Sequence, residues 1–100
     1  MYTIRIHEVI FPPDIEEKLW WKHGELAQVD VDEAIDNPIE DPRWDVDPLH
    51  GSRVLIVGDT TNFGTVFVAL DPVDPERGVW SVRTAFPVDD GFLREKEGDK

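Results

Sequence analysis

The chain contains no cysteine and no long hydrophobic run, and it has few basic residues. Without cysteine it can form neither a disulfide framework nor a thiolate metal site, and a thiol nucleophile is excluded. No apolar stretch approaches the roughly 20 residues that a membrane-spanning helix needs. The N-terminus also lacks the long apolar centre of a signal peptide, so a cytoplasmic protein is expected.

Acidic charge dominates what is present. The sequence has 22 Asp and Glu against 10 Lys and Arg, a formal net charge of −12. Eight acids lie between residues 30 and 47, where Arg43 is the only basic residue. Such a segment is typical of a solvated face that keeps a protein soluble, of a docking surface for a basic partner, or of adaptation to high salt. The eight are Asp30, Asp32, Glu33, Asp36, Glu40, Asp41, Asp45 and Asp47.

The length and the apolar content predict a single packed domain. The chain has 100 residues, of which 40% are hydrophobic, including four Trp and five Phe. A second core would be too small to be stable alone. We expect one α+β domain over residues 1–88, followed by a polar, flexible tail over residues 89–100.

The first quarter of the chain predicts a strand and a helix. Residues 2–10 alternate apolar and polar side chains, as a half-buried strand does, and Pro12-Pro13 ends the pattern. Asp14 is expected to cap a helix, with Glu17 completing a capping box. Gly24 is expected to end that helix in the left-handed conformation.

A second helix is expected at once. Asp30 and Glu33 have the capping-box spacing, and Val29 is expected to pack against Ala34 as a hydrophobic staple. Asn37-Pro38 ends the helix, which predicts a compact two-helix hairpin. Residues 39–52 are expected to be mostly loop, with a short extended piece around residues 43–46.

Three strand-like segments follow, over residues 53–58, 64–70 and 78–86. Segments of turn composition, residues 59–64 and 71–78, connect them. Consecutive strands on short loops form an antiparallel meander. The sequence therefore predicts an α+β fold: an N-terminal strand, a two-helix hairpin packed on one face of the sheet, and a meander of three to four strands.

Five short motifs follow one another along the chain. They are Lys22-His23-Gly24, the helix from Val31 to Asn37-Pro38, the strand Val54-Leu55-Ile56-Val57-Gly58, the strand Val66-Phe67-Val68, and Trp80-Ser81-Val82-Arg83-Thr84-Ala85. Their order resembles a known family, the BrnT-type toxins of the RelE superfamily. The resemblance covers residues 11–86 and implies a RelE-like fold, RNA cleavage and pairing with a DNA-binding antitoxin. The chain departs from the family at Pro87-Val88-Asp89-Asp90-Gly91, where a basic helix is typical, and in its acidic charge.

The resemblance selects a candidate catalytic set that needs no metal ion and no cofactor: Arg83, His23, Lys22 and Arg53. Arg83 matches the family's strand arginine, and its guanidinium could clamp the scissile phosphate. His23 would carry the proton, with His50 close to Arg53 in sequence. Each residue also has a structural explanation. Lys22 and His23 suit the negative end of a helix, Arg83 could pair with an acid, and Arg53 could simply flank a strand.

The second candidate site is a surface expected to bind a partner protein. Trp44 lies in the acidic segment beside Asp41, Asp45 and Asp47, and exposed aromatic residues next to charge are typical interface anchors. Trp21 is also expected at such a surface, because it and Trp20 cannot point the same way on one helix. Trp80 is expected in the core. Alternatively, these aromatic side chains fold back over the sheet edge.

Two functions therefore remain open on sequence grounds. The first is a toxin-family ribonuclease held by an antitoxin. The second is a non-catalytic protein on the same fold that binds a basic protein partner through its acidic face. The histidines at 7, 23 and 50 have no metal-ligand spacing, so no metal site is expected.

Overall fold

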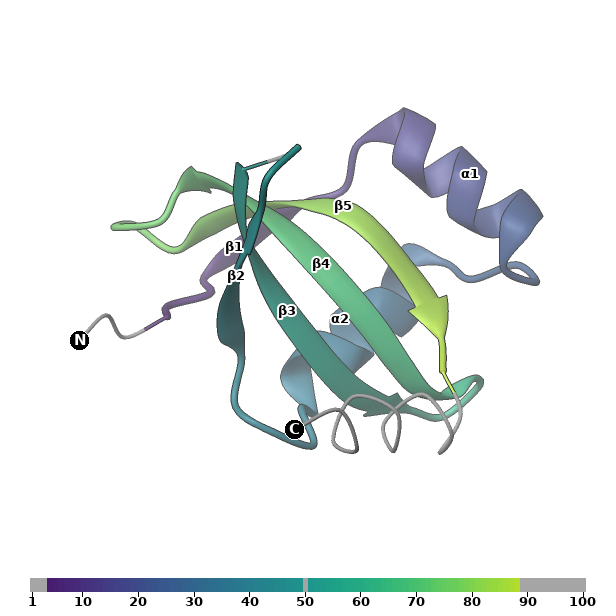
Figure 1. The fold of residues 1–100 in the computed structure, drawn as a ribbon. Helices are drawn as coiled ribbons and strands as arrows, with labels where there is room; N and C mark the ends of the chain where they lie inside the picture. The colour runs from purple at the N-terminus through teal and green to yellow at the C-terminus, as the bar shows by residue number, and fades with distance from the viewer. Residues whose placement is uncertain (1–3, 50, 89–100) are drawn as a thin grey trace.

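The computed structural model describes residues 4–49 and 51–88 (Figure 1), apart from the side chain of Asp47. The predicted tail over residues 89–100 and His50 lie outside this part of the chain. The element order is α+β, as the sequence predicts. It runs β1 (Glu8–Ile10), α1 (Pro13–Lys22), α2 (Gln28–Asp36), β2 (Arg43–Asp47), β3 (Gly51–Thr60), β4 (Gly64–Asp74) and β5 (Val79–Pro87).

The five strands form one sheet in the order β1-β5-β4-β3-β2. Strands β2 to β5 form the expected antiparallel meander, in which Ile56 lies opposite Val68 and Val68 opposite Ala85. Strand β1 lies parallel to β5, with Glu8 opposite Val79. The sheet is therefore mixed, because β1 adds a parallel neighbour to the predicted antiparallel meander. A parallel neighbour needs a long connection, and here two helices and three strands lie between the paired strands.

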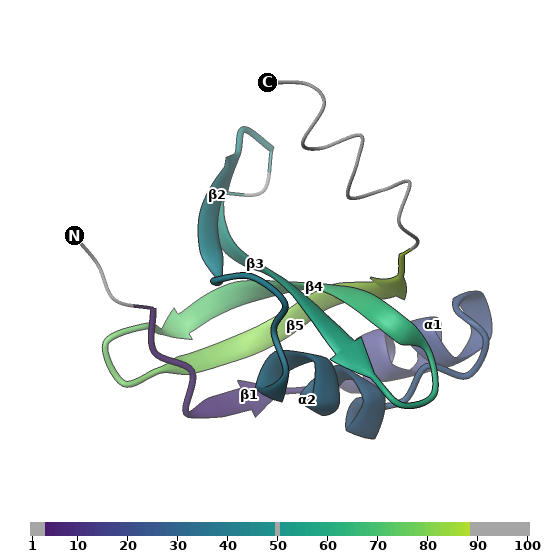
Figure 2. The ribbon, with the colours of Figure 1, turned by 90° about the horizontal axis from the view of Figure 1, so that it is seen from below.

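Both helices lie on the same side of the sheet, as Figure 2 shows. Helix α2 packs mainly against β3 and β4, whereas α1 packs against β5. The core between the helices and the sheet is built from apolar side chains, of which Trp80 is the largest. Trp80 has no exposed surface, and its indole N–H donates a hydrogen bond to the Arg5 carbonyl over 2.6 Å. The buried members of the core are Leu19, Leu26, Val31, Ala34, Val54, Ile56, Val66, Val68, Leu70, Trp80, Val82 and Ala85.

Helix α2 approaches β3 so closely that a glycine is required at the crossing. A Cβ atom at Gly58 would overlap the backbone carbonyl of Ala34. Beside this crossing, Pro38 bridges to Gly58, and the amide of Ile39 donates to the carbonyl of Val57 over 2.9 Å. The end of α2 is thereby tied directly to the sheet.

Both predicted helix starts were too late. Helix α1 begins at Pro13, so Asp14 lies in its first turn, where its charge complements the helix dipole. Helix α2 begins at Gln28, after an extended Ala27, and the Asp30 carboxylate accepts the Ala27 amide over 3.0 Å. Asp30 is therefore the third helical residue and not the cap. Val29 is 70% exposed and forms no staple with Ala34.

The predicted end of α1 is confirmed, because Gly24 has a φ of +67°. The predicted strand over residues 2–10 was too long, since its described part is in strand conformation only from Glu8. The segment expected to be mostly loop contains β2 and the start of β3, because Arg43 and Asp47 pair with Leu55 and Gly51.

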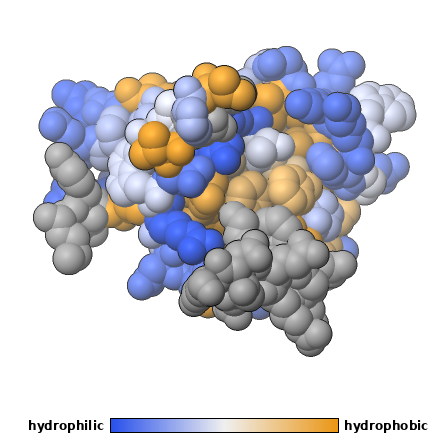
Figure 3. All heavy atoms as spheres, viewed as in Figure 1, coloured by the Kyte–Doolittle hydropathy of each residue, from blue (hydrophilic) through white to orange (hydrophobic). Residues whose placement is uncertain are grey.

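The face of the sheet opposite the helices has a smaller apolar cluster. Leu55, Val57, Phe67 and Ala69 form it, and Phe86 and Val88 pack against it. Figure 3 views the molecule from this side and shows hydrophobic surface between strongly hydrophilic regions.

Candidate functional site

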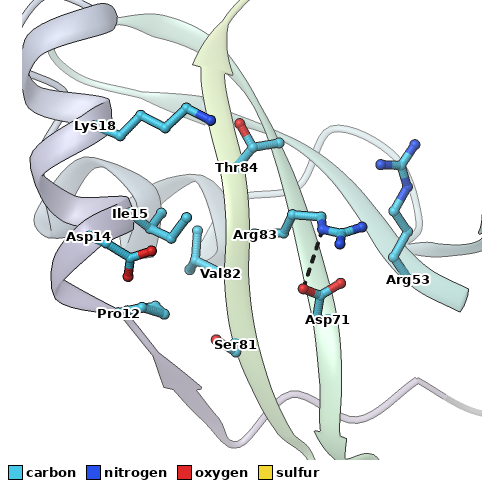
Figure 4. A pocket seen from close by; sticks show the side chains of 10 residues that line it. All are labelled: Pro12, Asp14, Ile15, Lys18, Arg53, Asp71, Ser81, Val82, Arg83 and Thr84. Atoms are coloured by element: carbon cyan, nitrogen blue, oxygen red, sulfur yellow. Dashed lines mark ion pairs between the residues drawn. The ribbon is translucent and has the colours of Figure 1, made fainter. Parts of the chain in front are cut away.

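A pocket of about 560 Å³ lies over β5, between α1 and the ends of β3 and β4. Figure 4 shows that Lys18 and Asp14 reach it from α1, while Arg83 and Arg53 lie across β5 on the other side. Three basic residues and two acids line it, so its lining is net positive in a chain of net charge −12. The lining residues are Pro12, Asp14, Ile15, Lys18, Arg53, Asp71, Ser81, Val82, Arg83 and Thr84.

A β-bulge in β5 positions Arg83. Ala69 pairs with Thr84, but the next residue of β4, Leu70, pairs with Val82. Arg83 is therefore an extra residue in the strand, and a bulge of this kind re-aims side chains. The sequence carries a faint signal of it, because the two buried positions Val82 and Ala85 are three residues apart, whereas regular alternation would place them two or four apart.

Both pocket arginines have carboxylate partners. The Nε atom of Arg83 lies 3.4 Å from Oδ2 of Asp71, and the Nε atom of Arg53 lies 3.1 Å from Oδ2 of Asp45. The Arg83 and Arg53 side chains are 28% and 25% exposed. The Nη1 atom of Arg83 is buried and has no hydrogen-bond partner among the described residues. An unmet buried donor typically costs about 1–3 kcal/mol.

Of the four predicted catalytic residues, the pocket brings together Arg53 and Arg83. His23 follows α1, and its ring lies 6.0 Å from that of Phe86. Because Phe86 is three residues beyond Arg83, that contact lies roughly 10 Å along β5 from the pocket arginine. Lys22 is exposed in the last turn of α1. The sequence interpretation missed Lys18, Asp14, Asp71, Ser81 and Thr84. The packing of α1 along β5 and the pairing of β5 with β4 bring them to the pocket.

The acidic segment is divided between structural contacts and free surface. Asp30 is only 4% exposed and accepts hydrogen bonds from the Ala27 amide and the Asn62 side chain. Glu33 accepts the amide and the hydroxyl of Thr61, over 2.7 and 2.8 Å, and these bonds hold the pKa of its carboxyl below the usual range. Both acids therefore tie α2 to the turn between β3 and β4.

Other acids of the segment stay at the surface. Asp32 is partly buried, and this partial burial is the main reason that its pKa is raised. The negative charge of the neighbouring Asp36 raises the pKa further. Glu40 pairs with Arg43 over 3.8 Å, Asp45 pairs with Arg53 in the pocket, and Asp41 is exposed. The expectation for Asp47 concerns a side chain outside the described part of the structure.

The two tryptophans of the predicted partner surface lie apart in the fold. Trp44, on β2, packs its ring 5.5 Å from the buried ring of Trp80 and remains 40% exposed. Trp21 is 77% exposed on α1, and Trp20 beside it is 43% exposed. Trp44 therefore combines the two alternatives, since it covers the edge of the core and still presents surface.

Residues 4–49 and 51–88 hold no group of three His, Asp or Glu side chains suited to a metal ion. In the same residues, no helix is long and apolar enough to cross a membrane. No model of a known protein family matches the sequence, and no curated protein matches it either. The resemblance to BrnT-type toxins therefore stays a prediction from the order of the short motifs.

Proposed function

We propose that this protein is a divergent BrnT-like ribonuclease toxin that acts in the cytoplasm and is held by an antitoxin. One observation carries the proposal. Arg53 and Arg83, which are 30 positions apart in sequence, line one pocket with Lys18, and Arg83 keeps a donor nitrogen without an acceptor. Asp71 pairs with the Nε atom of that guanidinium, and in this proposal a ligand oxygen would accept a hydrogen bond from Nη1.

In this proposal the pocket holds the scissile phosphate of RNA. Arg83 would bind a non-bridging oxygen, and its attraction would strengthen as negative charge builds in the transition state. Arg53 and Lys18 would add positive potential. Proton transfer at the 2′-hydroxyl would fall to the carboxylates of Asp14 or Asp71, because these line the pocket and His23 does not.

Arg83→Ala tests the proposal. The purified wild-type protein should cut RNA, and its expression without an antitoxin should slow growth. Arg83→Ala should lower the rate of RNA cleavage on the order of 10²-fold or more. Arg77→Ala is the matched control, because Arg77 also pairs with an aspartate, Asp74, but is 85% exposed and lies outside the pocket. Equal losses for the two variants, or intact RNA with a folded wild-type sample, would contradict the ribonuclease proposal.

A second candidate is a non-catalytic protein that binds a basic partner. The ion pairs Arg83–Asp71 and Arg53–Asp45 favour it, because they neutralise the two arginines on which RNA binding would depend. A chain of net charge −12 also repels phosphate, and phosphate neutralisation supplies most RNA affinity. In the experiment above, this candidate predicts intact RNA. It also predicts that the affinity for a basic partner falls at higher salt concentration and in the Asp41→Asn variant, because Asp41 is exposed.

A further inference from the structure

Strand β2 forms an outer edge of the sheet, and its position there bears on how a partner binds. In the order β1-β5-β4-β3-β2 it pairs with β3 alone, and no described strand lies against its other side. A strand in this position offers a row of backbone N–H and C=O groups to another chain. Figure 2 shows β2 and the start of β3 rising away from the rest of the sheet, on the side opposite the helices.

The side chains of β2 differ between its two faces. Trp44 and Val46 share one face, and they are 40% and 72% exposed. Arg43 and Asp45 alternate with them on the other face. The opposite edge of the sheet is less suited to another strand, because β1 has three residues whereas β2 has five.

Charge selects the partner. Residues 40–47 contain four acids and one arginine. Glu40 pairs with that arginine and Asp45 pairs with Arg53, while Asp41 is exposed. A second copy of the chain would bring the same acids and a net charge of −12 to the same edge. A basic strand would instead meet the net negative charge of this segment and the exposed apolar side chains of Trp44 and Val46.

We propose that β2 is the site of strand addition for a basic, extended segment of a protein partner, with apolar side chains against Trp44 and Val46. Backbone hydrogen bonds would supply affinity, and the alternating side chains would supply register. This inference rests on the second candidate function, because it requires a basic partner. It adds the place on the protein and the mode by which that partner binds.

A heptapeptide of alternating lysine and valine is the probe, and amide hydrogen exchange of the full chain is the readout. The peptide should bind and slow exchange at β2. Val46→Lys should weaken binding by roughly tenfold or more, because it sets like charge against the peptide at the edge. Val29→Lys is the matched control, since Val29 is similarly exposed, at 70%, but lies on α2 and not on β2. A glutamate–valine peptide should not bind.

Three results would overturn the inference. The first is equal binding by the Val46→Lys and Val29→Lys variants. The second is equal binding of a lysine–valine peptide whose central valine is proline, which would leave charge alone as the cause. The third is a dimer of the chain alone with β2 already protected, which would make a second copy the occupant. A basic partner that binds with strong salt dependence but leaves β2 unprotected would retain the second candidate function and reject strand addition.

Discussion

The two faces of the sheet are built by the same strands but carry different chemistry. The face under α1 and α2 is apolar throughout, and its residues from Val54 to Ala85 are at most 1% exposed. The opposite face combines a small apolar cluster around Phe67 with paired, partly exposed arginines at Arg53 and Arg83. The helix-covered face therefore supplies the stability of the fold. The other face can carry ionic side chains for binding at a small desolvation cost, because these groups keep contact with water.

Trp80→Ala should give the largest loss of stability, because it removes the bulkiest side chain of the helix-covered face. The free energy of unfolding should fall by about 3–5 kcal/mol, and the Arg5 carbonyl loses its donor as well. Trp44→Ala removes the other ring of the same tilted pair, but that ring is 40% exposed, so the loss should be less than half as large. Urea denaturation measures both. Equal losses would mean that Trp44 belongs to the core as fully as Trp80.

Gly58→Ala should have the next largest effect, because the new methyl group would meet the Ala34 carbonyl of α2. We expect a loss of about 1–3 kcal/mol, the usual cost of overpacking. Gly64→Ala separates packing from backbone strain, since Gly64 has a φ of +67° but open space around it. That variant should cost about 1 kcal/mol. If Gly58→Ala is the milder change in thermal unfolding, α2 is not held tightly against β3.

The smallest effects should come from two acids of α2 whose pKa values shift in opposite directions. The lowered pKa of Glu33 means that its contribution to stability is present above its unfolded value of 4.5 and is lost as pH falls through the folded pKa. Glu33→Gln should therefore flatten the acid limb of the stability curve. Unfolding by urea between neutral and acidic pH measures the change.

Asp32 should show the reverse behaviour. Its raised pKa means that the charged form is disfavoured in the folded state, so Asp32→Asn should slightly stabilise the protein at neutral pH. That gain should disappear as pH falls through the raised folded pKa towards 3.8, because the wild-type carboxyl then becomes neutral as well. Parallel curves for wild type and Asp32→Asn at all pH values would contradict this assignment.

Much of the fold could be predicted from local pattern. The meander follows from three β-rich segments separated by turn compositions, and Gly24 marks the end of α1 because few other residues adopt a positive φ readily. The helix starts were misplaced because the pattern Asp30 to Glu33 is shared by a cap and by a first turn. Asp30 accepts the Ala27 amide from the third helical position, which leaves the start ambiguous in sequence.

The candidate site was predictable only in part. Arg83 could be selected from its motif and Arg53 from its position directly before one, but Lys18 and Asp71 could not, because neither lies in or beside a motif. His23 could be placed at the end of α1 but not against Phe86, which depends on how α1 packs along β5. The acidic count of residues 30–47 was plain, yet the sequence did not separate Asp30 and Glu33, which bond to the fold, from the exposed Asp41.

The sequence by itself determined the element types, the antiparallel meander and the acidic charge, because these depend on periodicity, turn residues and composition within a few positions of the chain. The tertiary structure decided three other features. These are the parallel pairing of β1 with β5, the bulge that aims Arg83 into the pocket, and the exposure of β2 as an edge. Each requires contacts between segments far apart in the chain, where packing and backbone hydrogen bonding outweigh local preference.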